Sequence, residues 1–227
     1  MNDMGQFRSA VTQWAARPAG EESAAGARAG ELAERIGLRT VVLVEGDSDV
    51  RALDALAARR GRDLAAESIA VIPLGGATNI GHFLARCGPQ GLGLPTTGLC
   101  DAGEVRHFQR ALEREGFGIA HTREELESLG FYVCEKDLED ELIRALGPAG
   151  VEQVIESEDE LRPFRTFQNQ PFHRGRSIDQ QLRRFMGTHA GRKSQYAHAM
   201  VRSLDPDRIP RPLERLLAHV QADHSAP

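Results

Sequence analysis

The chain has 227 residues, of which 41% are hydrophobic and 27% are charged, and its formal net charge is −5. This length and composition predict a cytoplasmic globular protein with one sizeable core and flanking helices. No apolar run reaches membrane-spanning length, and the first residues lack the basic and then apolar layout of a signal peptide, so we expect no membrane partner. The negative net charge argues against a protein that coats nucleic acid nonspecifically.

The N-terminal part of the chain predicts short helices. Residues 7–16, which include Trp14, have a helical pattern, and an Ala-, Glu- and Gly-rich stretch separates them from a second candidate helix at residues 31–36. We expect the second helix to pack on the sheet that follows.

The most informative stretch is an apolar run that ends in acids. Residues 40–44 are typical of a strand covered on both faces, and residues 48–59 carry apolar side chains at helical spacing. Glu45 ends the strand and Asp49 lies in the first helical turn. Both carboxylates can therefore converge outside the carboxyl edge of the sheet, where open α/β sheets bind ligands. Oxygen ligands of this kind suit a hard divalent cation.

A structural alternative exists for these acids. Asp47, Ser48 and Asp49 are ordinary residues for a helix N-terminus, where they cap backbone amides and oppose the helix dipole. A second acidic turn favours a functional interpretation, because the short apolar segment at residues 97–100 ends at Asp101. If the two strands are neighbours, their acidic turns face each other.

Two further strands complete a predicted sheet. Residues 68–74 form a strand followed by a glycine pair at residues 75–76 and a helix at residues 80–87, and the glycines allow a close approach of backbone to a ligand. Residues 131–134 form a fourth strand, and the helix after it begins with the acids of residues 135–142. Alternating strands and helices predict an α/β fold with a mostly parallel four-stranded sheet.

The C-terminal part is predicted to be helical and is basic. The candidate helices are residues 161–167, 178–186, 192–204 and 212–220. Residues 161–217 hold 12 Lys/Arg and 4 Asp/Glu, a net charge of +8, whereas the remainder holds 16 and 29, a net charge of −13. A basic half beside an acidic, cation-binding half suits a phosphodiester substrate. The candidate phosphate-binding residues are Arg174, Arg176, Arg183, Arg184 and Arg192, although each could instead lie on a solvated helix face.

These segments together resemble a TOPRIM domain, a family that includes primases, topoisomerases and nucleases. The resemblance is carried by VLVEGDSD at residues 42–49, VIPLGG at 71–76 and GLCDAGE at 98–104. The later KDLEDEL (136–142) and GRKSQYAHAMV (191–201) segments resemble more narrowly the OLD ("overcoming lysogenization defect") nucleases. The resemblance implies a Rossmann-like TOPRIM core, which we predict at residues 39–150, between an N-terminal helical segment (1–38) and a basic helical extension (151–227).

The resemblance also implies a function and a set of site residues. The function is a Mg²⁺- or Mn²⁺-dependent nuclease that hydrolyses phosphodiester bonds, with DNA favoured over RNA as the partner. The implied metal ligands, for one or two ions, are Glu45, Asp49, Asp101, Asp137 and Glu139. Glu45 is also the acid nearest the chemistry, and Lys193 is the lysine that offsets charge on the scissile phosphate. Lys193 could otherwise be an ordinary surface lysine on an amphipathic helix.

One departure from the family pattern keeps a second interpretation open. The second motif of the family usually has two aspartates separated by one residue, but here Asp101 is followed by Ala102 and Gly103. Glu104 could substitute for the missing ligand, or a single ion could suffice. The alternative function is a non-catalytic TOPRIM-like module that binds nucleic acid, a nucleotide or a protein partner.

Other chemistries have little support in the sequence. No G-x-x-x-x-G-K-[ST] phosphate loop occurs, so the ATPase that accompanies OLD-type TOPRIM domains would have to be a separate subunit. The eight histidines form no zinc-binding pattern. The three cysteines, Cys87, Cys100 and Cys134, lie in predicted buried elements, so we expect reduced core residues.

Overall fold

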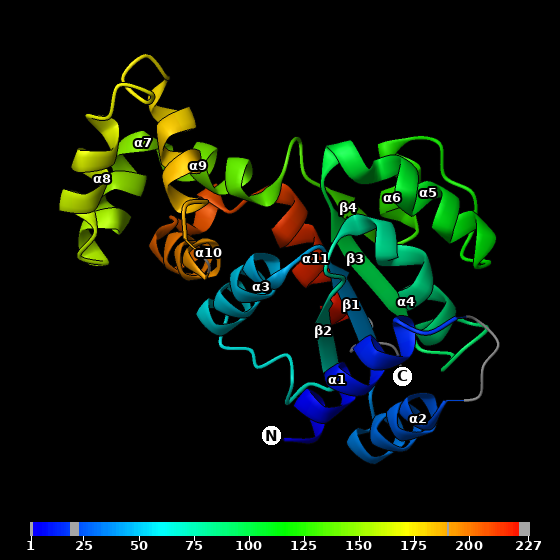
Figure 1. Cartoon of the computed structure of the whole chain (residues 1–227). Coiled ribbons are helices and arrows are strands. Elements are labelled where there is room, and N and C mark those ends of the chain that lie inside the picture. The colour runs from blue at the N-terminus through cyan, green and yellow to red at the C-terminus, as the bar shows by residue number, and fades with distance from the viewer. Residues whose placement is uncertain (1, 19–22, 190, 223–227) are drawn as a thin grey trace.

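The computed structural model describes residues 2–18, 23–189 and 191–222. Figure 1 shows a central sheet with helices on both of its faces and a group of helices that projects to one side. We call the projecting part the helical arm; it consists of the second half of α7 (Leu138–Ser157) together with α8 (Leu161–Gln168) and α9 (Ile178–Met186). No helix within the described ranges is long and apolar enough to cross a membrane.

The sheet has four parallel strands in the order β2-β1-β3-β4. The strands are β1 (Thr40–Val44), β2 (Ile69–Pro73), β3 (Thr96–Cys100) and β4 (Phe131–Val133). The two central strands are β1 and β3, with Val42 opposite Thr97 and Leu43 opposite Gly98. The predicted α/β fold with a four-stranded parallel sheet is therefore confirmed, and the acidic ends of β1 and β3 are neighbours.

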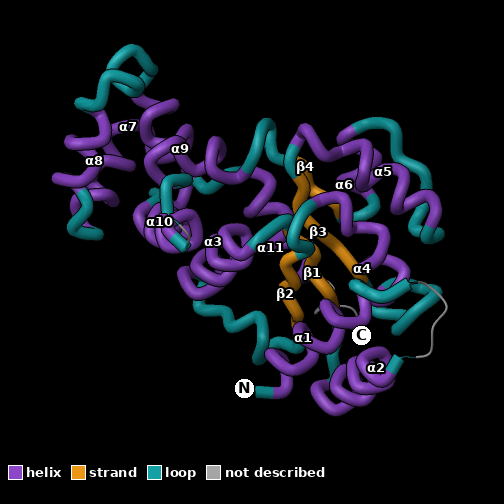
Figure 2. Tube along the Cα trace, in the orientation of Figure 1, coloured by secondary structure: helices purple, strands orange, loops and turns teal. Residues whose placement is uncertain are grey.

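Helices cover both faces of the sheet, which explains the continuous apolar run of β1 (Figure 2). Val41 and Leu43 belong to one hydrophobic core, whereas Val42 and Val44 belong to the other. The first core is completed by α1 (Asp3–Ala15), α2 (Ala24–Ile36), α4 (Ile80–Cys87), α5 (Val105–Arg114) and α6 (Arg123–Ser128). The second is completed by α3 (Asp47–Arg59), α7 (Leu138–Ser157), α8 (Leu161–Gln168), α9 (Ile178–Met186), α10 (Arg192–Ser203) and α11 (Arg211–Ala222). Three short 3₁₀ helices, η1 (Ala77–Asn79), η2 (Ala102–Glu104) and η3 (Pro206–Arg208), connect these elements.

A break in α7 directs the helical arm away from the sheet. Gly147 has φ 72° and ψ 161° inside α7, and Pro148 follows it. A positive φ suits glycine, and proline cannot donate the backbone hydrogen bond that would continue the helix. The second half of α7 therefore leaves the sheet and packs with α8 and α9 in the arm (Figure 1).

Aromatic rings and one carboxylate join the arm to α10. The ring centroids of Phe164 and Phe185 are 5.0 Å apart, and those of Phe185 and Tyr196 are 6.4 Å apart. The Tyr196 hydroxyl donates to Glu160 at 2.7 Å, and Arg192 donates to the other oxygen of Glu160 at 2.6 Å. Because α10 also packs along α3, these contacts fix the arm relative to the acidic edge of the sheet.

The predicted helices and strands are found in the structure, but two helices begin earlier than expected. The helix predicted at residues 7–16 begins at Asp3. The helix expected at residues 31–36 begins earlier, at Ala24. The small residues in its first half allow close packing, since a Cβ added at Gly26 would lie 2.8 Å from the Trp14 ring.

Cys87, Cys100 and Cys134 are buried and unpaired, as expected. The proposed boundaries of the three chain regions, at residues 38 and 150, stay a prediction.

A side chain at Gly98 should destabilise the centre of the sheet. A Cβ at Gly98 would lie 2.5 Å from the Leu43 carbonyl oxygen and 3.2 Å from the Phe131 ring. Overpacking of this kind costs about 1–3 kcal/mol, so we expect Gly98→Ala to lower the free energy of unfolding by that amount in urea titrations. Gly103→Ala is the matched control, because a Cβ there meets nothing within 4 Å. Equal unfolding midpoints for the two variants would contradict this account of β3.

Candidate functional site

A polar cleft of about 300 Å³ lies at the carboxyl edge of the sheet. Its walls are the ends of β1 and β3, the start of α7, and parts of α9 and α10. The polar side chains that line it are Glu45, Ser48, Asp49, Asp101, Asp137, Glu139, Arg183 and Lys193. All five acids expected as metal ligands, which come from three separate strand ends, thus lie in one cleft together with Lys193.

The turn after β1 brings two carboxylates to the cleft. Glu45 directly follows the strand, and Asp49 lies in the first turn of α3 with 8% of its surface exposed. The Asp49 carboxylate accepts a hydrogen bond from the backbone amide of Gly46 at 2.8 Å. Asp49 therefore does have the capping role considered from the sequence. The same side chain lines the cleft, so the structural role does not exclude a functional one.

Asp101, at the end of β3, lines the cleft together with Glu45, which follows the neighbouring strand β1. Burial and the negative charges of Glu45 and Asp49 raise the pKa of Asp101 to about 8. Burial also raises the pKa of Asp49 to about 6, although the bond from Gly46 opposes this shift. These acids repel one another in a poorly solvated place, a condition that a bound cation relieves.

The acids after β4 are already neutralised by cations. Asp137 caps α7 by accepting from the amide of Asp140 at 2.9 Å, and its other oxygen forms an ion pair with Arg183. Glu139, with 8% of its surface exposed, forms an ion pair with Lys193 at 2.8 Å. The cleft thus contains two kinds of carboxylate: those of β1 and β3 face one another, and those of α7 face basic side chains.

A basic groove continues from the cleft along α9. It measures about 390 Å³ and shares Glu139, Arg183 and Lys193 with the cleft. Two further candidate phosphate-binding residues, Arg176 and Arg184, also line it. Three of the five predicted arginines are therefore grouped beside the acidic cleft.

The other candidate residues lie outside the cleft. Arg174 donates to the backbone carbonyl of Asn169 at 2.8 Å. Arg192, at the start of α10, pairs with Glu160 and lies over the Phe185 ring, so its contacts join α10 to the arm. Glu104, considered as a substitute ligand, has its carboxylate 3.6 Å from His107 and does not line the cleft.

Sequence reasoning considered Ser48 only as a helix-capping residue, although it lines the cleft. Its position between two acids at a helix N-terminus was the available signal. The pairing of Asp137 with Arg183 and of Glu139 with Lys193 had no local signal, because 46 and 54 residues separate the partners along the chain.

The carboxylates of β1 and β3 fit a divalent cation. The Glu45 Oε2 atom is buried and has no hydrogen-bond partner, which leaves an acceptor available beside Asp49 and Asp101. Carboxylate oxygens are the ligands that Mg²⁺ and Mn²⁺ take. In the described residues, no three His, Cys, Asp or Glu side chains are close enough together to form a complete metal site. The carboxylates of the cleft would therefore have to move closer to one another to bind an ion.

Comparison with known proteins points to one family. Residues 38–102 match the family model "Overcoming lysogenization defect protein-like, TOPRIM domain". The fold is similar to the C-terminal region of the Burkholderia pseudomallei OLD protein, with 23% identity and a TM-score of 0.59 over 82% of this chain and 98% of that chain. It is also similar to the C-terminal region of the Xanthomonas campestris pv. campestris OLD protein, with 25% identity and a TM-score of 0.59 over 83% and 98% of the two chains. No curated protein matches the sequence.

Removing one of the repelling carboxylates should stabilise the metal-free protein. The pKa of Asp101 is raised in the folded state from 3.8 to about 8, so the folded protein binds this proton more tightly than the unfolded chain does. Stability is then lost as the pH rises from about 4 to about 8. In EDTA at pH 8 we expect Asp101→Asn to raise the free energy of unfolding by about 1 kcal/mol, a value already reduced for solvent screening. The melting temperature should then lie about 2–4 °C above that of the wild type.

The comparison is made by thermal unfolding at pH 5 and pH 8, with Asp207→Asn as the exposed control. The gain from Asp101→Asn should shrink at pH 5, where the wild-type group is protonated, and Mg²⁺ should raise the melting temperature of the wild type more than that of the variant. A lower melting temperature for Asp101→Asn at pH 8 would refute the proposed repulsion.

Proposed function

Because the chain contains an OLD-like TOPRIM domain, we propose that it is a divalent-metal-dependent nuclease that hydrolyses phosphodiester bonds, with DNA as the substrate rather than RNA. One observation carries the proposal: five acids from three strand ends share one cleft with Lys193, and a basic groove adjoins it. Domains of this type are nuclease domains in the OLD proteins, so the family and the donor chemistry point to the same activity.

Glu45, Asp49 and Asp101 are the residues proposed to hold a first Mg²⁺ or Mn²⁺ ion. None of the three forms an ion pair with a basic side chain in the described residues, and Glu45 retains an unpartnered oxygen. Asp137 and Glu139 are the proposed ligands of a second ion. A bound divalent ion supplies a Lewis acid that activates water and stabilises charge on the leaving oxygen.

The basic residues of the cleft are proposed to bind the scissile phosphate. The Lys193 side chain is 54% exposed, so its ammonium group is accessible to an entering phosphate although it pairs with Glu139. The Arg183 side chain is 34% exposed and borders both the cleft and the basic groove. Cations at these positions would offset the charge that develops on the phosphate in the transition state.

The test is cleavage of supercoiled plasmid and of labelled single-stranded DNA and RNA with Mg²⁺ or Mn²⁺. We expect the wild type to cut DNA, Glu45→Gln to lose metal-dependent cutting, and Lys193→Met to lose about 10²–10³-fold in rate, as for removal of one group that stabilises transition-state charge. Lys193→Met should still bind metal, because it removes a competing cation from Glu139.

Two matched controls separate these effects from changes in fold or charge. Lys136→Met replaces the other lysine of the chain, which is exposed and pairs with Asp140. Glu104→Gln replaces an acid close to Asp101 that does not line the cleft. Both should cut at the wild-type rate. A folded wild type that cuts none of the substrates with either metal would contradict the nuclease proposal for the chain alone, and the test would then be repeated with a separate ATPase subunit as partner.

A non-catalytic TOPRIM-like module that binds a partner is the second candidate function. Two observations favour it. Gly103 occupies the position where the family usually has a second aspartate. Asp137 and Glu139 are already neutralised by Arg183 and Lys193. Metal binding separates the two candidates, because a nuclease needs its ions and a binding module does not.

Restoring the second aspartate should strengthen metal binding. A Cβ at Gly103 meets nothing within 4 Å, and the residue lies two positions after Asp101, so an aspartate there is accommodated without strain. We expect Gly103→Asp to bind Mn²⁺ about tenfold more tightly than the wild type, as measured by calorimetry. This corresponds to about 1.4 kcal/mol of additional binding free energy. Gly103→Asn is the uncharged control and should show no gain. Equal affinities for both variants would place residue 103 outside the metal site.

A further inference from the structure

A second cavity lies in the helical arm, beyond the basic groove. It measures about 570 Å³ and lies between α8, α9, the loop of residues 169–177 and the start of α10. We call it the arm pocket and define it by the residues used below, which are Arg162, Phe167, Phe172, His173 and Arg184. Nothing in the proposed metal chemistry requires this pocket.

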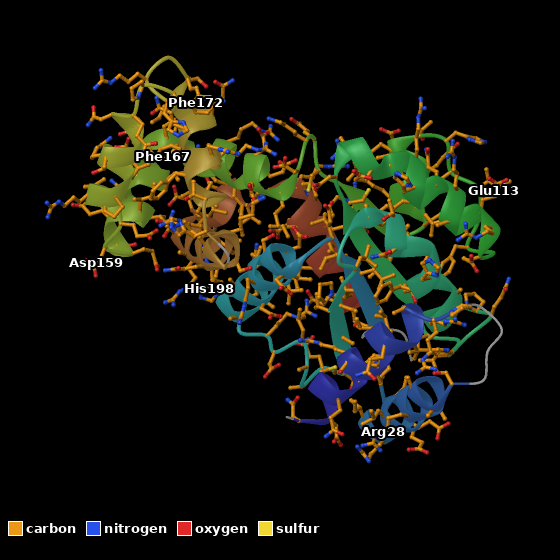
Figure 3. The ribbon with its side chains drawn as sticks, in the orientation of Figure 1. Arg28, Glu113, Asp159, Phe167, Phe172 and His198 are labelled. Atoms are coloured by element: carbon orange, nitrogen blue, oxygen red, sulfur yellow. The ribbon has the colours of Figure 1, made fainter. Side chains whose placement is uncertain are left out.

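Aromatic side chains form one wall of the arm pocket. The rings of Phe167 and His173 are stacked, with centroids 3.7 Å apart and an angle of 23° between the planes. The adjacent Phe172 is 67% exposed and lies at the outer end of the arm, with the Arg176 guanidinium over its ring, 4.6 Å from the centroid (Figure 3). The ring face opposite Arg176 offers a flat surface on which another ring can stack.

A buried polar atom marks the same wall. The His173 side chain is buried, with 6% of the residue exposed, yet its Nδ1 atom has no hydrogen-bond partner. A buried polar group without a partner destabilises the fold unless something satisfies it. A ligand with ring nitrogens or amino groups could do so.

Two uncompensated cations border the aromatic wall. Arg162 and Arg184 line the arm pocket, and neither forms an ion pair with any acid in the part of the chain that the structure describes. Their neighbour Arg192, in contrast, is neutralised by Glu160. Guanidinium groups without carboxylate partners, beside exposed aromatic surface, suit a ligand that combines a phosphate with a flat base.

The arm pocket is connected to the acidic cleft by the basic groove. The groove shares Arg184 with the arm pocket, and it shares Glu139, Arg183 and Lys193 with the cleft. A single chain molecule can therefore contact all three in sequence.

We propose that the arm pocket binds an unpaired nucleotide of the strand that is cut in the cleft, with its base on Phe172, beside His173, and its phosphates at Arg184 and Arg162. The proposal rests on the nuclease function and names its substrate class, a single strand or a duplex with a single-stranded end. A paired base cannot reach the aromatic wall, because it is stacked inside its own duplex.

The test is binding of a short fluorescein-labelled oligo(dT), measured by anisotropy in EDTA so that no cleavage occurs. We expect Phe172→Ala to weaken binding about tenfold without changing its salt dependence, because it removes a stacking surface. Arg184→Ala should weaken binding and also reduce the slope of log K against log salt by about 0.7, the value for one phosphate contact in a single strand. Blunt duplex DNA should bind equally to the wild type and Phe172→Ala.

The chain offers a matched control for each variant. Ile119→Ala removes a second large hydrophobic side chain that is exposed among the described residues, and it lies between α5 and α6, away from the arm. Arg110→Ala removes an exposed arginine from α5, on the opposite side of the sheet. Both should bind oligo(dT) as the wild type does. Oligo(U) in parallel identifies the nucleic acid: tighter binding of oligo(U) would assign the arm pocket to RNA.

The outcomes distinguish this proposal from the proposed function. If Phe172→Ala and Arg184→Ala bind oligo(dT) and oligo(U) as tightly as the wild type, the arm pocket has no role in strand binding, whether or not the protein cuts DNA. If the variants lose binding while the wild type shows no cleavage with any metal, the arm pocket is established and the nuclease proposal fails. A wild type that binds blunt duplex but neither oligonucleotide would overturn the proposal outright.

Discussion

Repulsion between carboxylates that the backbone holds together is the constraint on which the site depends. The pairing of β1 with β3 fixes Glu45 and Asp101 at one edge of the sheet, and Asp49 is fixed by its bond to the Gly46 amide. None of these groups can move apart without disturbing strands that are buried on both faces. The fold therefore maintains an unfavourable concentration of negative charge, which together with burial raises the pKa of Asp101.

The opposite wall of the cleft is supplied by distant parts of the chain. Arg183 and Lys193 reach the acids of α7 from α9 and α10, and their positions depend on the packing of α10 along α3 and on the contacts of Glu160 with Tyr196 and Arg192. The helical arm is thus more than an appendage of the sheet. It carries Arg183, one of the two cations that face these acids, and its Arg184 forms part of the basic groove.

The difference between local and distant signals explains what could be predicted from the sequence. Glu45, Asp49 and Asp101 follow apolar strands directly, so their convergence could be inferred from parallel pairing alone. The family resemblance added Asp137, Glu139 and Lys193, which share the cleft. Three features could not be predicted because they depend on how the helices pack: the contacts of Arg192, the position of Glu104 outside the cleft, and the arm pocket. The sequence pattern of one helix does not indicate which residues of another helix it contacts.

The two sets of acids differ in what an incoming cation must displace. At Glu45, Asp49 and Asp101 a divalent ion would replace a proton and end a repulsion, so binding there is favoured by the charge already present. At Asp137 and Glu139 it would have to displace Arg183 and Lys193, which already compensate those charges. A phosphate that enters along the basic groove attracts the same two side chains. Under the proposed function, phosphate binding and occupation of the second position would therefore be coupled, because both require Arg183 and Lys193 to leave their carboxylates.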